Sequence, residues 1–226
     1  MKISIIIPAL NEAQSIGQVL AAIPCEYAGE ILVIDGGSTD GTTEIARAAG
    51  AIVVHQARRG YGQACATGSE NAHGDILVFM DGDGADDPRC LPGLIAPLQN
   101  GSVDLALGSR LAGQVQAGAM PWHQWLGNWL AARLINLLYG QDLTDLSPLR
   151  AVRRAGLHAL DMQEMTYGWP TEMIVKAIQR GWRIVEIPVE YRPRSGGKSK
   201  ISGTLHGSAL ATYCILRTIL RYNRKR

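Results

Sequence analysis

Runs of apolar residues recur along the first half of the chain, and longer segments of helical character separate them. An uninterrupted apolar run is typical of a strand that is buried on both faces of a parallel sheet. Strand–helix alternation with short connections predicts an α/β fold, in which helices cover both faces of a mostly parallel sheet. The predicted strands are residues 3–7, 31–34, 51–55, 76–80 and 103–107, and the predicted helices lie at about 12–23, 42–49, 60–72 and 88–98.

The second half of the chain has a less regular pattern. Residues 111–121 are rich in glycine and alanine and predict an irregular loop. Residues 142–154 predict a polar connection, and residues 183–191 predict a strand in which Pro188 favours the edge of the sheet. The remaining predicted helices are residues 122–139, 171–179 and 205–222.

The helix predicted over residues 122–139 carries Trp122, Trp125 and Trp129, with leucines beside them. This spacing places the three indoles on one side of the helix. We expect that side to pack against the protein core. The alternative is an amphipathic helix at a membrane interface, where tryptophan is favoured.

The composition is that of an ordinary globular protein of 226 residues, 46% of them hydrophobic and 19% charged. This length suits one domain with a small appendage. The formal net charge of +2 is unevenly distributed, because residues 183–226 carry +8 and residues 1–182 therefore carry −6. An acidic body favours a metal or nucleotide site, and a basic tail favours an anionic partner.

The cysteines and the absence of targeting signals indicate the compartment. No Cys-x-x-Cys pair occurs, so the cysteines predict reduced thiols and neither a disulfide framework nor a zinc site. Met1-Lys2 leads directly into a strand, without a signal peptide, and no apolar run reaches the roughly 18 residues of a membrane-spanning helix. We therefore expect a cytoplasmic protein that is at most peripheral at the inner face of the plasma membrane. The cysteines are Cys25, Cys65, Cys90 and Cys214.

Four carboxylates, those of Asp81, Asp83, Asp86 and Asp87, crowd the end of the strand predicted over residues 76–80. Carboxylates this close together repel one another unless a cation lies among them. Asp-x-Asp at a strand end offers hard oxygen ligands to Mg²⁺ or Mn²⁺, and the phosphates of a substrate can complete the coordination. The alternative is a solvated acidic turn. We expect Asp83 to ligate a metal, and Asp86 and Asp87 to be solvated at the start of the next helix.

Polar clusters at residues 8–12, 35–40 and 81–87 each follow a predicted strand. Ligands of open α/β sheets bind at the carboxyl ends of the strands, so we expect the three clusters to meet in one crevice. Asp35 can accept hydrogen bonds from uracil or guanine, since both bases present N–H donors. Asp40 is expected to cap the helix that follows it. A dinucleotide oxidoreductase is excluded, because no G-x-G-x-x-G sequence follows the first strand.

Several motifs, in order along nearly the whole chain, resemble those of the inverting family 2 glycosyltransferases. The later motifs are similar to those of the polyprenyl-phosphate (dolichol-phosphate) mannosyl- and glucosyltransferase branch. The motifs are Ile5-Ile6-Ile7-Pro8-Ala9-Leu10-Asn11-Glu12, residues 33–42, Met80-Asp81-Gly82-Asp83, Gly108-Ser109-Arg110, residues 145–150, and residues 186–189 leading to residues 194–200.

This resemblance implies that residues 1–202 form a GT-A (Rossmann-like) domain of a metal-dependent hexosyltransferase, with a GDP- or UDP-linked sugar as donor. It implies nucleotide contacts for Pro8, Ala9, Glu12, Asp35 and Asp81, a Mg²⁺ or Mn²⁺ site at Asp81 and Asp83, and catalytic roles for Asp83 and Arg110. The residues expected at the phosphates or the acceptor are Arg110, Ser147, Arg150, Arg194, Lys198 and Lys200.

The basic loop carries Arg192, Arg194, Lys198 and Lys200 within nine residues, interleaved with serine and glycine. Arginine binds phosphate with a planar fork and lysine binds it as a point charge, so phosphate is the expected guest. The alternative is a solvated charged loop. Nucleic acid is not an expected partner, because aromatic residues are not interleaved with the basic ones and the rest of the chain is acidic.

The expected acceptor is a lipid-linked phosphate, whose oxygen is already anionic and needs no strong base. Residues 121–128 lack the basic residues that the resemblance leads us to expect there. A hydroxyl acceptor is therefore an alternative, with His123 or Glu172 as the general base. A further alternative is a nucleotide-sugar-binding protein without catalytic activity.

Residues 203–226 predict a basic amphipathic helix after the GT-A domain. Its apolar positions lie at spacings of three or four and share one face, and basic residues flank them. Such a helix can lie on an anionic membrane surface. The alternative is that its apolar face packs against the helix over residues 122–139. The apolar residues are Leu205, Ala209, Tyr213, Leu216 and Leu220, and the basic residues are Arg217, Arg221, Arg224, Lys225 and Arg226.

Overall fold

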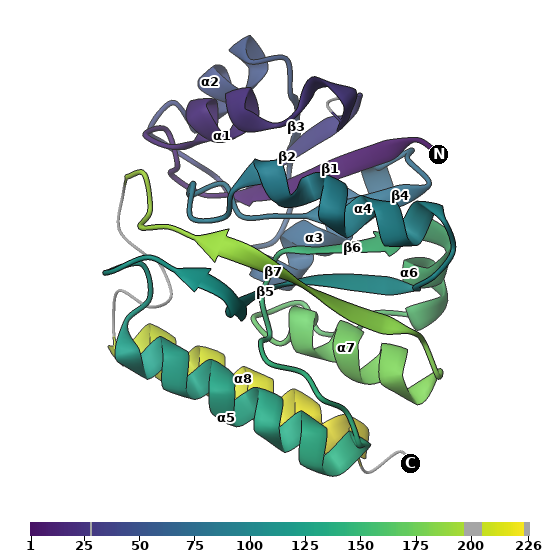
Figure 1. Cartoon of the computed structure of the whole chain (residues 1–226). Helices are drawn as coiled ribbons and strands as arrows, with labels where there is room; N and C mark the ends of the chain where they lie inside the picture. Colours follow the sequence, from purple (N-terminus) through teal and green to yellow (C-terminus); the bar gives the residue numbers. More distant parts are fainter. Residues whose placement is uncertain (28, 197–204, 224–226) are drawn as a thin grey trace.

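The computed structural model describes residues 1–27, 29–196 and 205–223. A seven-stranded sheet lies at the centre of the molecule (Figure 1), with the strand order β3-β2-β1-β4-β6-β5-β7. The strands are β1 (Ile3–Ala9), β2 (Ile31–Asp35), β3 (Ile52–His55), β4 (Ile76–Phe79), β5 (Leu105–Val115), β6 (Arg150–Arg153) and β7 (Ile184–Tyr191).

All neighbouring strands are parallel except β6, which runs antiparallel to both β4 and β5. The predicted class, a mostly parallel α/β sheet, is therefore confirmed. Pro188 lies in β7, the outermost strand, where a missing backbone N–H is tolerated, and this prediction is also confirmed.

Helices cover both faces of the sheet because side chains alternate along each strand. Ile5 and Ile7 of β1 pack with α1, α2 and α4, whereas Ile6 packs with α3, α6 and α7 on the other face. The helices α5 and α8 lie side by side and form a further layer beyond α7 (Figure 1). The helices are α1 (Ile16–Ala22), α2 (Thr42–Ala48), α3 (Tyr61–Asn71), α4 (Leu91–Gln99), α5 (Trp122–Tyr139), α6 (Arg154–Leu160), α7 (Trp169–Gln179) and α8 (Leu205–Asn223).

The order of the strands creates a crevice at the carboxyl ends of β1 and β4. From β1 the chain proceeds to β2 and β3 on one side, and then returns to β4 on the other side of β1. At such a reversal the connecting segments leave in opposite directions and leave room for a ligand between them. The polar clusters predicted after β1, β2 and β4 therefore border this crevice.

The prediction of an irregular loop over residues 111–121 is wrong for the first half of this segment, because β5 continues to Val115. After an irregularity in the register, Gln114 and Val115 pair with Glu190 and Tyr191 of β7. Pairing with a distant strand overrides the weak strand propensity of this glycine-rich segment. A Cβ at Gly113 would lie only 2.1 Å from the Val189 carbonyl oxygen, so the close approach of the two strands requires glycine there.

The prediction of a polar connection over residues 142–154 is wrong for the last part of this segment, where β6 and the start of α6 lie. With arginine at both ends, Arg150–Arg153 has no strand-like apolar pattern. The position of β6 is determined by backbone hydrogen bonds to the neighbouring strands β4 and β5. The Arg153 side chain adds a further contact, since its Nη1 donates to the Val103 carbonyl oxygen at 3.0 Å. These are tertiary contacts, which a local pattern does not reveal.

The prediction that the tryptophans of α5 face the core is wrong. Trp122, Trp125 and Trp129 are 76%, 46% and 37% exposed. The helix instead buries Ala131, Ala132, Ile135 and Tyr139, because small residues allow it to approach its neighbours closely. Trp125 and Trp129 stack on each other with ring centroids 6.3 Å apart.

The C-terminal helix α8 packs on α5 and α7 through Ile219 and Tyr222, which belong to the hydrophobic cluster below the sheet. The Tyr139 hydroxyl donates to the Ile219 carbonyl oxygen at 3.0 Å. Leu210, Tyr213, Leu216 and Leu220 stay exposed; Leu205 and Ala209 have side chains outside the described part. The division of the chain at residue 202 stays a prediction.

Two smaller expectations concern the cysteines and the membrane. All four cysteines are free thiols, as predicted. Across the described part of the chain, none of the helices has the length and apolar character that crossing a bilayer requires.

Candidate active site

The loops that follow β1, β2 and β4 are held together by hydrogen bonds, so the predicted convergence is confirmed. The Asn11 amide donates to Ser38 Oγ at 2.9 Å, and the Glu12 amide donates to Thr42 Oγ1 at 2.8 Å. Ser15 Oγ donates to the Gly82 carbonyl oxygen at 2.8 Å and ties the first loop to the third.

The N-cap position of α2 is Gly41 and not Asp40, but the Asp40 carboxylate still accepts from the first residue of the helix. Its Oδ1 accepts from the Thr42 amide at 3.1 Å, and its Oδ2 accepts from the Ala13 amide at 3.0 Å. The carboxylate therefore fixes two of the converging loops relative to each other.

Asp35 ends β2, next to Pro8 and Ala9 of β1, and its side chain is buried. Its carboxylate accepts from the Gly37 amide at 3.1 Å and from the Ser38 amide at 3.0 Å. Burial raises the pKa of Asp35, but the hydrogen bonds from Ser38, Gly37 and His55 outweigh burial and leave this pKa below its ordinary value. Asp35 is therefore an ionised hydrogen-bond acceptor at the edge of the crevice.

Asp81 and Asp83 follow β4. Burial, followed by the negative charge of Asp83, raises the pKa of Asp81 to about 7. Tyr61, at the start of α3, donates its hydroxyl proton to Asp81 Oδ1 at 3.2 Å. Asp83 is buried, and its Oδ1 accepts from the Ala85 amide at 2.9 Å. Two carboxylates that repel each other at the end of a strand provide the electrostatic conditions for a divalent cation.

Arg194 lies against the second of these carboxylates. Its Nη2 is 2.5 Å from Asp83 Oδ2, and its Nη1 is 3.9 Å from Glu12 Oε1. Nη1 is buried and has no hydrogen-bond partner in the described part of the chain. The guanidinium thus bridges the first and third loops and retains a donor for an anionic ligand.

The segment after β7 lies close over the Asp83–Ala85 turn and positions Arg194. The Arg192 amide donates to the Ala85 carbonyl oxygen at 2.9 Å, and the Ser195 amide donates to the Asp83 carbonyl oxygen at 3.1 Å. Gly84 has a φ of +79°, and a Cβ there would lie 2.4 Å from Ser195 Oγ. The positive φ favours glycine at this turn, and a larger residue would also require the Ser195 side chain to move.

The expectation that Asp86 and Asp87 are solvated is wrong, because both are buried. Burial and the charges of Asp81 and Asp83 raise the pKa of Asp86 to about 8. Asp87 accepts from the Arg89 amide at 3.1 Å and pairs with Arg192 at 2.7 Å. The segment after β7 covers this part of the chain, and sequence spacing alone does not show that cover.

Arg110 lies near these carboxylates, in β5, and is buried. Its Nε and Nη2 each donate to an oxygen of Asp145 at 2.8 Å, and its guanidinium lies 5.1 Å from the centre of the Tyr191 ring. Asp145 is in turn held by Glu186, which accepts from the Asp145 amide at 3.0 Å. The cation is therefore fixed in position before any ligand binds.

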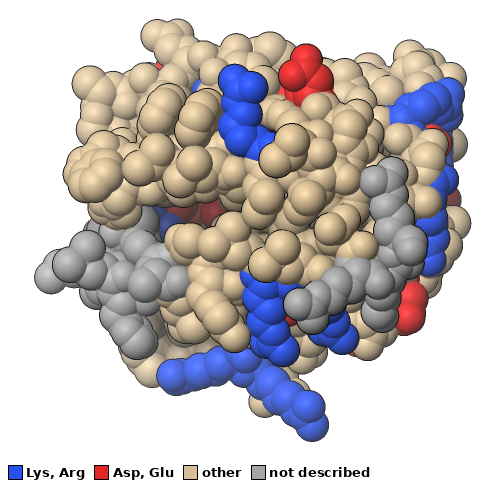
Figure 2. Space-filling model, turned by 90° about the horizontal axis from the view of Figure 1, so that it is seen from below, with Lys and Arg blue, Asp and Glu red and all other residues tan. Residues whose placement is uncertain are grey.

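A cavity of about 520 Å³ begins at these charged groups and continues between α5 and α8. Asp81, Asp83, Arg110 and Arg194 line one end of it. Seen from below Figure 1, the surface is mostly uncharged, and charged atoms are visible inside a hollow (Figure 2). The residues that line the rest include Leu130, Ala131, Leu134, Leu146, Pro148, Ala211, Ile215 and Leu216, together with His123, Gln124 and Asn128.

Ser147 and Arg150 do not have the positions expected of phosphate ligands. Both are buried, and neither lines the cavity. The Arg150 guanidinium donates to the carbonyl oxygens of Ser147, Pro148 and Pro170, and burial lowers its pKa to about 10. The Ser147 hydroxyl accepts from the Leu149 amide at 3.3 Å. These contacts stabilise the turn before β6.

Glu172 is likewise placed outside the cavity, which argues against the general-base role. Its buried carboxylate accepts from the Gln163 amide at 3.0 Å and the Glu164 amide at 2.7 Å, and it pairs with Lys176 at 2.8 Å. The Tyr222 hydroxyl of α8 also donates to it. The carboxylate therefore anchors α8 and the loop before α7.

Three cavity-lining aromatic residues, Tyr61, Tyr167 and Tyr191, were not identified from the sequence. Gly60 and Gly62 on either side of Tyr61 pack closely against the backbone of Met165 and Glu164, a close approach that only glycine allows. This pair of glycines is the one local signal that marks the position. Lys198 and Lys200 lie outside the described residues.

The donor set fits a divalent cation that binds together with a substrate. Within the described ranges, no group of three or more histidine, cysteine or acidic side chains is arranged to hold a metal ion. Mg²⁺ and Mn²⁺ are commonly held by one or two carboxylates, with substrate phosphates as further ligands. Asp81 and Asp83 match that pattern, since they leave most of the coordination to the ligand. The fold and this site together have the character of a nucleotide-dependent group transferase.

Comparison with known proteins identifies the family. Residues 4–160 match the model described as Glycosyl transferase family 2. An uncharacterised glycosyltransferase of Mycobacterium tuberculosis is 39% identical over 209 residues, which are 92% of this chain and 94% of that protein. The undecaprenyl-phosphate mannosyltransferase of Micrococcus luteus is 33% identical over 93% of this chain and 91% of that protein.

Among solved structures, the glucosyl-3-phosphoglycerate synthase of M. tuberculosis, in complex with Mn²⁺, UDP-glucose and phosphoglyceric acid, superposes with a TM-score of 0.79. It is 25% identical, and the match covers 98% of this chain and 79% of that chain. The chain belongs to glycosyltransferase family 2, has the GT-A fold, and is a hexosyltransferase. The Mn²⁺ in that complex agrees with the divalent cation predicted from the sequence.

Replacing Asp83 by asparagine should remove metal binding and leave the fold intact. Asparagine keeps the shape and one acceptor oxygen but lacks the charge, so the affinity for Mn²⁺ should fall by about 100-fold or more. Electron paramagnetic resonance titration of Mn²⁺ in the presence of UDP measures the change. The matched control is Asp142→Asn, which removes an exposed carboxylate. Full activity of the wild-type enzyme in excess EDTA would contradict the assignment of a metal site.

Replacing Arg194 by methionine should have opposite effects on two ligands. Without the guanidinium, Asp83 loses a competing cation, so nucleotide-free protein should bind Mn²⁺ more tightly than the wild type. Loss of a charge-assisted contact to the diphosphate should weaken UDP binding by about tenfold or more. Arg89→Met, which removes an exposed arginine paired with Asp87, is the control. Weaker Mn²⁺ binding by Arg194→Met would show that the guanidinium does not compete with the metal.

Proposed function

We propose that the enzyme transfers a hexose, with inversion, from a UDP-linked sugar to a polyprenyl-phosphate-type lipid at a membrane surface. The observation that carries this proposal is the cavity, which joins the Asp81–Asp83 end to the space between α5 and α8. One end is charged and the other is apolar. A phosphate attached to a long hydrocarbon chain has the same division.

The charged end suits the reacting groups. Asp81 and Asp83 would hold Mg²⁺ or Mn²⁺, which supplies Lewis-acid stabilisation of the departing diphosphate when bound. Arg194 presents a buried guanidinium that retains a donor, and Arg110 adds a second cation held rigid by Asp145. Preorganised positive charge of this kind favours a transition state in which negative charge moves onto a leaving group.

The acceptor phosphate would react without a general base. Its anionic oxygen attacks the anomeric carbon from the side opposite the nucleoside diphosphate, the bond between that carbon and the diphosphate breaks, and the configuration inverts. The enzyme's contribution is to orient the two anions and to reduce their repulsion. The cavity's walls support this role, because no carboxylate lines its apolar part among the described residues.

The apolar end suits an isoprenoid chain. Gly127 and Ala131 of α5 face Ala211 and Thr212 of α8, and these small residues leave a slot between the helices. A Cβ at Gly127 would find only Thr212 Oγ1 near it, at 4.0 Å, so the slot has open space there. A free phosphorylated sugar or glycerate would gain little from these walls.

The outer surface of the same helices supports contact with a membrane. Trp122, Trp125 and Trp129 are exposed on α5, and Tyr213 and Leu220 are exposed on α8. Arg217 and Arg221 stand beside the α8 residues. Tryptophan is favoured at the lipid–water interface, and each arginine near anionic lipid adds about 1 kcal/mol of attraction. A peripheral enzyme would thereby bring the slot to its lipid substrate.

A soluble acceptor is the second candidate. The structurally similar synthase binds phosphoglyceric acid, and His123 lines the cavity of this chain, where it could act as a base for a hydroxyl. Phosphoglyceric acid carries a carboxylate in addition to its phosphate, so it needs more positive charge than a lipid phosphate does, and Arg110 and Arg194 are already paired with carboxylates. The lipid phosphate is therefore the better match.

A variant that fills the slot tests the proposal. Gly127→Leu should fold well, since leucine favours a helix by about 1 kcal/mol relative to glycine. Overfilling the slot should lower transfer to a long polyprenyl phosphate in anionic vesicles by about tenfold or more, while UDP affinity stays unchanged. Radiolabelled sugar transfer and calorimetry measure the two quantities.

The control is Leu137→Trp, which adds bulk to the outer side of α5, away from the cavity. Assays with 3-phosphoglycerate should show little transfer. Rapid transfer to 3-phosphoglycerate with none to the lipid would contradict the proposal, and UDP binding without transfer to either acceptor would indicate a binding protein.

A further inference from the structure

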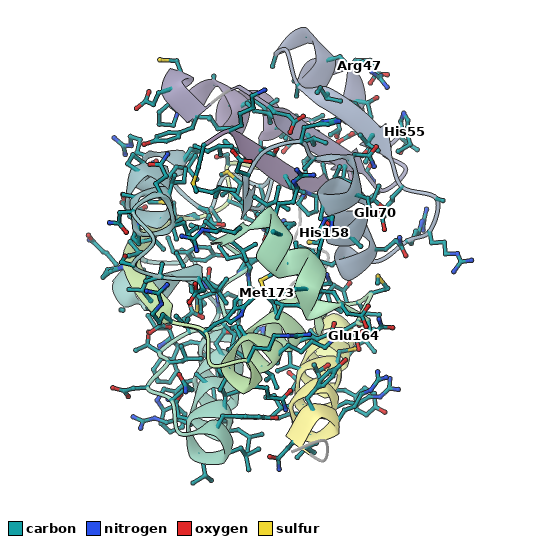
Figure 3. All side chains as sticks on the ribbon, turned by 90° about the vertical axis from the view of Figure 1, so that its right-hand side faces the viewer. Arg47, His55, Glu70, His158, Glu164 and Met173 are labelled. Atoms are coloured by element: carbon teal, nitrogen blue, oxygen red, sulfur yellow. The ribbon has the colours of Figure 1, made fainter. Side chains whose placement is uncertain are left out.

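His55 lies at the end of β3, beside Asp35 at the end of β2, and none of the chemistry proposed above uses it. Its Nδ1 lies 3.0 Å from Asp35 Oδ2, and Arg47 Nη2 of α2 lies 3.2 Å from its Nε2. The His55 side chain is 62% exposed, whereas that of Asp35 is 2% exposed. Figure 3 shows Arg47 and His55 near each other on the same side of the molecule.

The contact with Arg47 determines which ring nitrogen of His55 carries the proton. A guanidinium only donates hydrogen bonds, so Nε2 must be the acceptor in the Arg47 contact. The proton is then on Nδ1, which donates it to Asp35. Arg47 therefore fixes the tautomer of His55 from outside, and His55 fixes one oxygen of the Asp35 carboxylate.

Every contact that Asp35 makes is with a donor: the amides of Gly37 and Ser38, and His55. The carboxylate is therefore held as an acceptor, in one rotational position about its χ2 bond. A ligand group that meets it must be a hydrogen-bond donor, and a ring nitrogen with a lone pair would be repelled. Uracil and guanine carry such an N–H in the ring, whereas cytosine and adenine present a lone pair at the equivalent atom.

The position of Asp35 suits the base of the proposed donor. β1 lies between β2 and β4, so Asp35 and the Asp81–Asp83 pair are separated by two strand spacings, about 10 Å. A nucleoside lying across Pro8 and Ala9 would place its diphosphate at one end and its base at the other.

Gln56 adds an independent sign of a ligand beside Asp35. Its amide nitrogen donates to the Asp35 carbonyl oxygen at 3.0 Å, and its side-chain Nε2 lies 3.1 Å from the position of a Cβ on Gly36. Its Oε1 is buried without a hydrogen-bond partner within the described part of the chain. Buried polar atoms are rarely left unpaired, and a polar ligand would supply the partner.

We propose that His55, held by Arg47, is a positioning residue that fixes Asp35 to accept the ring N–H of the donor's base. The pair thereby selects a uracil nucleotide over a cytosine nucleotide. This inference rests on the proposed function, since it assigns a role within the same donor site.

Calorimetry with UDP and CDP, each in the presence of Mn²⁺, tests the inference. The wild-type protein should bind UDP at least about tenfold more tightly than CDP, because one base edge donates to Asp35 and the other repels it. His55→Leu removes the donor and frees the carboxylate to rotate. The ratio of the two affinities should fall toward one, mainly through weaker UDP binding.

His55→Asn should restore much of the preference for UDP over CDP, because the asparagine side-chain amide can donate to Asp35 from nearly the position of the histidine Nδ1. The matched control is His73→Leu, since His73 Nδ1 pairs with Glu30 Oε1 at 2.8 Å, away from the carboxyl ends of the strands. An unchanged UDP/CDP ratio in His55→Leu, with UDP still bound, would overturn this inference alone. Failure of the wild-type protein to bind any of UDP, GDP and CDP would overturn the donor site as well.

Discussion

Negative charge concentrated at the end of β4 is the constraint on which the rest of the site depends. Asp81, Asp83 and Asp86 lie within six residues, and burial together with their mutual repulsion raises the pKa values of Asp81 and Asp86. Such a cluster is stable only if positive charge is brought to it. Arg110 comes from β5 and Arg194 from the segment after β7, so strands far apart in sequence must end at the same place. A divalent cation and a diphosphate would enter this balance of charges and alter it.

The same arrangement connects the donor site to the layer formed by α5 and α8. β5 leads into α5, and the segment after β7 leads toward α8, so the two elements that supply the arginines also supply the walls of the apolar slot. Glu172 holds the far end of this layer by accepting from Tyr222. Because burial raises the pKa of Glu172 while Lys176 and Tyr222 lower it more, its folded-state pKa lies below the ordinary value. The contacts of the ionised Glu172 carboxylate therefore stabilise the fold fully at pH values above its ordinary pKa. This stabilisation is lost as the pH falls through the lower, folded-state pKa.

Much of the fold could be predicted from the sequence, because each of the first five strands contains a short apolar run and polar residues follow it. The positions of Asp35, Asp81 and Asp83 followed from the same pattern. What could not be predicted depends on distant contacts. β6 has arginine at both ends and is a strand because β4 and β5 flank it. Arg150 and Glu172 carry charges that suggest ligands, yet their partners are backbone groups and α8. The tryptophans of α5 have a regular helical spacing, which shows that they share a face but not which way that face points.

The central claim is that an acceptor chain lies between α5 and α8 while its phosphate meets the charged end of the cavity. A polyprenyl phosphate with a photoreactive group on its isoprenoid chain tests this directly, with the labelled residues identified by mass spectrometry in the presence of UDP and Mn²⁺. The account predicts labels on the cavity-lining side, at residues such as Leu134 and Ile215, and loss of these labels when unmodified polyprenyl phosphate is added. Labels confined to the outward residues Leu137 and Leu220, or labels that excess polyprenyl phosphate does not displace, would contradict it.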